Sequence, residues 1–241
     1  MPAGALLALL LLAPLRLLAQ PAMPAAGGDY PGFDVRYGIA PGADLPALVG
    51  KVALISMTAE KFLDPATGER RLVGYGESQG VFDLSLAEIR AVLDDPAGAT
   101  SYSPRLLEAR LEEADGPRLV FYQDIGISFL GIRLSYRFRA EQVRDDLGPA
   151  EVGYRVRLLE SLDGHFFEAY SSWYLKEVSV EGRSLVYVRY YTRPGLRRPP
   201  LGTELVVRSF TPGELRATME RVAKEARRRA SLSLDSDMPP R

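Results

Sequence analysis

Residues that commonly carry out chemistry are scarce in this sequence. The 241 residues include one histidine, His165, and no cysteine, which excludes disulfides, thiolate metal sites and a cysteine nucleophile. One histidine leaves at most one candidate base for a Ser-His-Asp triad and one imidazole for a zinc site. Because His165 follows Asp163-Gly164, a dipeptide typical of hairpin turns, we interpret it as an exposed turn residue.

Other signatures of catalysis are missing as well. The sequence shows no carboxylate pair, Ser–His signature, phosphate-binding loop or metal-ligand spacing above the level of chance. We therefore expect no catalytic residue, no metal and no cofactor. The net charge of −1 and the isoelectric point near 6.0 give no general electrostatic reason to expect nucleic acid as a partner.

Aromatic side chains suggest a binding site instead. The region between residues 121 and 191 is rich in phenylalanine and tyrosine and contains the single tryptophan. A pocket lined by aromatic rings and a few hydroxyl groups suits an apolar ligand with a polar end. A packed core uses the same residue types, so both interpretations stay open for each ring. The residues that we predict to contact a ligand are Tyr136, Phe138, Tyr154, Trp173 and Tyr190, with Met219 and Val222 from a C-terminal helix.

Alternating apolar and polar residues predict that this aromatic region is a β-sheet. The apolar positions are Ile132, Leu134, Tyr136 and Phe138 in one run and Tyr154, Val156 and Leu158 in another. A period of two is the pattern of a sheet with one wet face, so most of the arginines at positions 139, 155, 157 and 189 should face solvent. Turn dipeptides at Asp115-Gly116, Asp163-Gly164 and Glu181-Gly182 separate the runs. We expect five or six antiparallel strands here, preceded by a strand pair at residues 51–58 and 71–82.

Two helices are expected to flank the long run of strands. Ser85 and Glu88 form a capping box that opens a short helix, which ends before Pro96, and a turn-rich loop follows it. The second helix is predicted at residues 211–229, with Thr211 as N-cap and Pro212 at the first helical position. Its apolar face, which should pack across the sheet, consists of Leu215, Met219, Val222, Ala223 and Ala226.

The segments outside this domain have their own signatures. Residues 1–26 contain an apolar run followed by small residues, the pattern of a secretory signal peptide, so we expect an exported, periplasmic or secreted protein. Residues 27–50 are rich in Gly, Pro and Ala and are predicted to form a linker or N-terminal arm. Residues 231–241 are polar and are predicted to be a disordered tail. The fold class that follows is α+β, with both helices on one face of an antiparallel sheet.

Three stretches carry a resemblance to a known family. A strand runs into a helix that ends in Val92-Leu93-Asp94-Asp95, and a new strand follows Ser103-Pro104; the other two stretches are residues 171–175 and 186–190. Over residues 51–230 this arrangement resembles the START-like (SRPBCC, helix-grip) superfamily, which includes lipid-transfer START, coenzyme-Q-binding and polyketide-cyclase-like domains. The resemblance implies a helix-grip fold, in which a curved antiparallel sheet and a long C-terminal helix enclose a hydrophobic ligand.

The sequence therefore leaves more than one class of function open. We favour an exported, non-catalytic binding or transfer protein for a lipid or other hydrophobic small molecule, with transient membrane contact. The alternative is a cyclase or aromatase-type enzyme that acts on a hydrophobic substrate in the same cavity, using pocket acids, tyrosines or arginines. An assembly partner with a collapsed cavity is a third reading. Arginines 227–229 can contact anionic lipid. Their predicted position at the C-terminal end of a helix, where positive charge complements the helix dipole, is sufficient to explain why they are basic.

Overall fold

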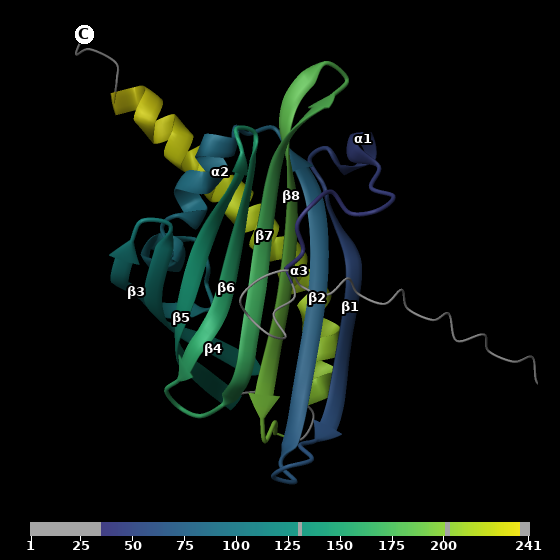
Figure 1. Cartoon of the computed structure of the whole chain (residues 1–241), viewed down its shortest axis with the longest axis vertical. Coiled ribbons are helices and arrows are strands. Elements are labelled where there is room, and N and C mark those ends of the chain that lie inside the picture. The colour runs from purple at the N-terminus through teal and green to yellow at the C-terminus, as the bar shows by residue number, and fades with distance from the viewer. Residues whose placement is uncertain (1–34, 130–131, 201–202, 237–241) are drawn as a thin grey trace, which may run out of the picture.

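The computed structural model describes residues 35–129, 132–200 and 203–236 (Figure 1). Within these ranges, eight strands form one open antiparallel sheet in the order β1-β2-β8-β7-β6-β5-β4-β3. The strands are β1 (Val52–Leu63), β2 (Arg70–Phe82), β3 (Leu106–Asp115), β4 (Arg118–Phe129), β5 (Ile132–Gly148), β6 (Glu151–Ser161), β7 (Phe166–Val180) and β8 (Arg183–Arg197). The predicted strand pair and the six-stranded meander are thus confirmed, and β8 returns to pair with β2.

The helices are distributed over both faces of the sheet. They are α1 (Leu45–Leu48), α2 (Leu86–Leu93), the 3₁₀ helix η1 (Ala97–Ser101) and α3 (Thr203–Ser236). The predicted capping box starts α2, because the Glu88 amide donates to Ser85 Oγ at 3.2 Å and the Ser85 amide donates to Glu88 Oε2 at 2.6 Å. The long helix α3 passes behind the sheet in the view of Figure 1, on the same face as α2, whereas α1 lies in front.

The ends of α3 differ from those predicted. The helix begins at Thr203, so the predicted start at Thr211 is wrong, and Pro212 lies inside the helix. A proline interrupts one helical hydrogen bond, but burial of the apolar face that follows it, from Leu215 to Ala226, can offset this cost. At the other end α3 continues through Arg229 to Ser236, into the segment predicted as a tail, and residues 237–241 lie outside the described residues.

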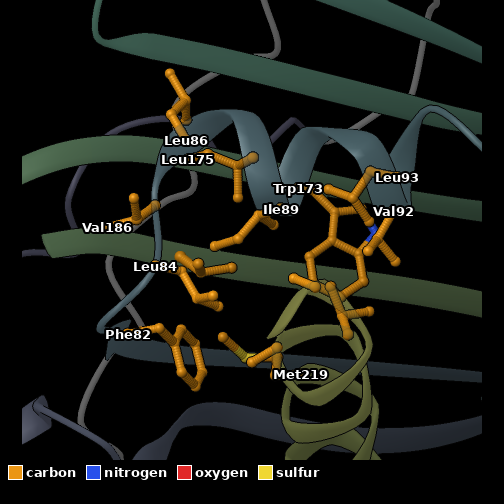
Figure 2. Packing of buried hydrophobic residues seen from close by; sticks show 14 of the residues in the cluster. Phe82, Leu84, Leu86, Ile89, Val92, Leu93, Trp173, Leu175, Val186 and Met219 are labelled. Atoms are coloured by element: carbon orange, nitrogen blue, oxygen red, sulfur yellow. The ribbon is translucent and has the colours of Figure 1, made fainter. Parts of the chain in front are cut away.

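The predicted apolar face of α3 is confirmed. Leu215, Met219, Val222, Ala223 and Ala226 are all at most 4% exposed. Figure 2 shows Met219 among side chains of β2, α2 and β7, including Phe82, Ile89 and Trp173. The helix approaches β2 so closely that a methyl group on Gly76 would overlap the side chain of Leu215. The core is therefore built between α3, α2 and one face of the sheet.

The N-terminal arm packs on the opposite face. Residues 1–34, including the predicted signal peptide, lie outside the described residues, but residues 35–50 cross the sheet over β7 and β8. The ring of Tyr37 stacks on Tyr174 at 6.0 Å, and its hydroxyl donates to Asp145 at 2.6 Å. Beneath the arm, Arg189 pairs with Glu77 and donates to the Gly38 carbonyl at 3.1 Å. Arg189, expected to face solvent, is therefore buried, because the arm covers this part of the polar face.

Candidate functional site

A cavity of about 310 Å³, open to solvent, lies between the sheet and α3. Its walls come from the α2–β3 segment, from the concave face of the sheet and from α3. Trp173 of β7 and Tyr190 of β8 stack in its wall, with ring centroids 4.1 Å apart. Burial raises the pKa of Tyr190, so its hydroxyl stays neutral over the physiological range. The two stacked rings give the wall an apolar surface that a hydrophobic molecule can contact.

A second cavity of about 190 Å³ continues along the same face of the sheet. The residues that line both cavities are Gln123, Ile125, Val156, Ser171 and Tyr190. The remaining wall of the second cavity combines the small side chains of Ala140, Ala169 and Thr192 with larger ones such as Phe138 and Phe166. The two cavities are therefore neighbours on one face of the sheet, and together we call them the groove, which extends from the α2 end of the sheet toward the β6–β7 turn.

Four of the predicted site residues line this groove. Trp173, Tyr190 and Val222 line the larger cavity, and Phe138 and Tyr190 line the smaller one. Their role as ligand contacts stays a prediction.

The other three lie outside the walls that the structure describes. The Tyr154 hydroxyl donates to Asp94 at 2.9 Å, and burial, followed by the Asp94 charge, raises the pKa of Tyr154. Met219 Sδ accepts from Ser78 Oγ at 2.9 Å in the core. Tyr136 packs against Phe166, with ring centroids 5.4 Å apart. These three side chains belong to the packed core and are not among the described lining residues of the two cavities.

Polar wall residues were not among the predicted site residues. Gln142 is 7% exposed, and its amide donates to the Leu93 carbonyl at 2.8 Å. Gln123 and Ser171 line both cavities. The alternation along the strands could have identified these polar wall residues, because Gln142 lies on the same strand face as Phe138, and Ser171 on the same face as Trp173. A polar residue on the inward, otherwise apolar face of a strand is therefore a sequence signal for a polar group in the wall of a binding site.

Three charged side chains stand where the larger cavity meets solvent. Arg105, just before β3, places Nη2 at 2.9 Å from Glu214 Oε1 of α3. Arg221, two turns along α3, places Nη1 at 3.4 Å from Glu214 Oε2. All three side chains line the cavity. In the part of the chain that the structure describes, no group of three His, Cys, Asp or Glu residues is arranged to hold a metal ion.

Sequence comparisons identify no relative. No family model matches this sequence, and no curated protein matches it. None of the helices within the described ranges is both long and apolar enough to cross a membrane.

Solved structures do match the fold. A STAR-related lipid transfer protein fragment from Xanthomonas axonopodis is 18% identical, with a TM-score of 0.50, and the match covers 70% of this chain and 98% of that chain. Human STARD10 is 10% identical, with a TM-score of 0.52 over 73% of this chain and 76% of that chain. The arrangement of one open, curved antiparallel sheet with a long C-terminal helix across its concave face is therefore the START-like helix-grip fold, and this chain has that fold.

Proposed function

We propose that this protein binds or transfers a lipid or another hydrophobic small molecule without chemical conversion. The observation that carries the proposal is the open groove between the sheet and α3, with the stacked Trp173 and Tyr190 in its wall. Protein interiors are normally filled to crystal-like density, so a groove of this size beside an aromatic wall favours a ligand over a core. The similarity in fold to a STAR-related lipid transfer protein supports the same reading.

The single tryptophan provides the test. Trp173 lines the cavity and is the only tryptophan of the chain, so its emission should change when an apolar ligand displaces water from the wall. Native mass spectrometry and solvent extraction of the purified protein should show a co-purifying hydrophobic molecule, and delipidated protein should regain a lipid probe with a Trp173 response.

A matched pair of variants on α3 tests whether the ligand binds in the larger cavity. Val222→Phe should fill the cavity and weaken probe binding by about tenfold or more, a loss of at least 1.4 kcal/mol. Lys224→Phe adds the same ring to an exposed position and should leave binding unchanged. Equal effects of both variants, or no bound molecule and no Trp173 response, would contradict the proposal. Conversion of the bound molecule into a product would instead identify an enzyme of the cyclase or aromatase type.

We also propose that the protein is exported and meets membranes transiently. The proposal is supported by the apolar run and small residues within residues 1–26. N-terminal sequencing of periplasmic or secreted material should give a start between residues 20 and 27. An intact Met1 on cytoplasmic protein would remove the export proposal. Co-sedimentation with vesicles during ligand uptake tests the membrane contact.

A further inference from the structure

The rim of the larger cavity carries an excess of positive charge. The charged residues in its described wall are Arg105, Arg221 and Glu214, and the other wall residues are uncharged. Two guanidinium groups and one carboxylate leave a net charge of +1 at the rim. The side chains of Arg105, Glu214 and Arg221 are 35%, 31% and 28% exposed, so this charge is only partly screened by water.

The geometry around Glu214 is that of an oxyanion site. Each oxygen of this carboxylate receives one arginine, Oε1 from Arg105 at 2.9 Å and Oε2 from Arg221 at 3.4 Å. A guanidinium group has five N–H donors in a planar fork that matches carboxylates and phosphates. Among the described side chains, Glu214 is the carboxylate that pairs with each of these two arginines. The two oxygens of one carboxylate cannot accept from all the N–H donors of two guanidinium groups. Both arginines therefore keep donors for a second oxyanion.

We propose that this rim is a headgroup subsite for an anionic amphiphile, and this inference rests on the proposed function. The apolar body of the ligand lies along the wall of Trp173 and Tyr190, and its terminal carboxylate or phosphate binds Arg105 and Arg221 at the rim. Glu214 occupies the guanidinium groups in the empty protein and competes with the headgroup. The site thus prefers an anionic end to a neutral end of equal chain length, since an ionised acceptor makes the stronger hydrogen bonds.

Two kinds of variant with opposite expected effects on the affinity for anionic probes test this assignment. Dodecanoate, dodecyl phosphate and dodecanol are matched probes whose binding Trp173 emission reports. Wild-type protein should bind both anions more tightly than the alcohol. Arg105→Gln and Arg221→Gln should weaken binding of the anions by about tenfold and leave dodecanol unchanged. Glu214→Gln should strengthen binding of the anions, because it removes the competitor. Arg216→Gln, at an exposed position of the same helix, is the control for the change in net charge.

Each other result overturns the proposal in a distinguishable way. Equal affinity for the three probes, with arginine variants that change all of them alike, removes the subsite but leaves the hydrophobic groove. A gain for dodecanol in Glu214→Gln would show that Glu214 closes the cavity rather than competes with a headgroup. Failure of every probe to bind rejects the proposed function as well. Binding of acetate or inorganic phosphate as tightly as the amphiphiles would assign the rim to a free anion.

Discussion

Met219 and Val222 lie one helical turn apart on the buried face of α3, yet truncation of the two side chains should have different consequences. Met219 is 1% exposed, outside the described cavity walls and packed among core side chains (Figure 2). Met219→Ala should leave a new void and cost about 2–5 kcal/mol of the free energy of unfolding. Because the void is separate from the groove, ligand affinity should stay within about twofold of wild type, less than about 0.5 kcal/mol.

Val222 is 4% exposed and lines the larger cavity. Val222→Ala removes two methyl groups that border the cavity, so the substitution creates little new void. The loss in free energy of unfolding should therefore come mainly from the lost hydrophobic burial of these groups and amount to about 1–1.5 kcal/mol. The same change widens the cavity at its α3 wall. It should therefore shift the preferred ligand toward bulkier molecules, which Met219→Ala should not do.

Urea denaturation measures both values, with unchanged slopes showing that only stability has changed. Ligand affinities come from titrations followed by Trp173 emission. The reasoning is refuted if the two variants lose equal stability, or if Met219→Ala changes ligand preference more than Val222→Ala does. The first result would mean that the two side chains are packed alike, and the second that Met219, not Val222, forms the ligand-facing surface of α3.

Two further predictions concern the packing and charges of α3. Gly76→Ala should cost about 1–3 kcal/mol in urea denaturation because its methyl group overlaps Leu215, whereas Gly213→Ala, with nothing within 4 Å, should gain about 0.5–1 kcal/mol. Hydrogen bonds from Arg228, with help from Arg229, lower the pKa of Glu225 to about 2. Because this pKa is lower in the folded protein than in the unfolded chain, where it is about 4.3, ionised Glu225 stabilises the fold above about pH 4.3. The stabilisation is lost as the pH falls toward about 2. The urea midpoint should therefore fall between about pH 4.5 and 2, and Glu225→Gln should flatten this part of the curve.

The fold was largely predictable because its local signals agree with its packing. The turn at Glu181-Gly182 has φ of 51° and 76°, the left-handed conformation that a two-residue hairpin loop needs. The start of α3 was missed because Thr211-Pro212 is a strong N-terminal signal. The helix nevertheless continues through Pro212. Local propensity cannot report a contact with a sheet formed earlier in the chain.

The role predicted for the basic residues depended on the C-terminal end of α3. Arginines 227–229 were explained as partners of a helix terminus, but α3 ends later and its last turn has no basic residue. Arg229 instead holds α3 to α2, since it donates to Asp95 at 2.9 Å and to the Ala91 carbonyl at 3.0 Å. Arg229 also pairs with Glu225, four residues earlier on the same helix face, at 2.8 Å.

The cavity follows from side-chain size on the inward face of the sheet. Near α2 the inward positions carry large residues such as Phe82 and Leu175, which fill the space beneath the helix. Farther along, the inward positions include Ala140, Ala169 and Ser171 beside larger residues, and these three are too short to reach across the concave surface. Alternation fixes which face a residue occupies, but only the curvature of the sheet decides whether a small residue there is close-packed or leaves a space. A larger apolar side chain at Ser171 would bury more surface and stabilise the fold while it excludes the ligand, the conflict between stability and function that is expected of a binding site.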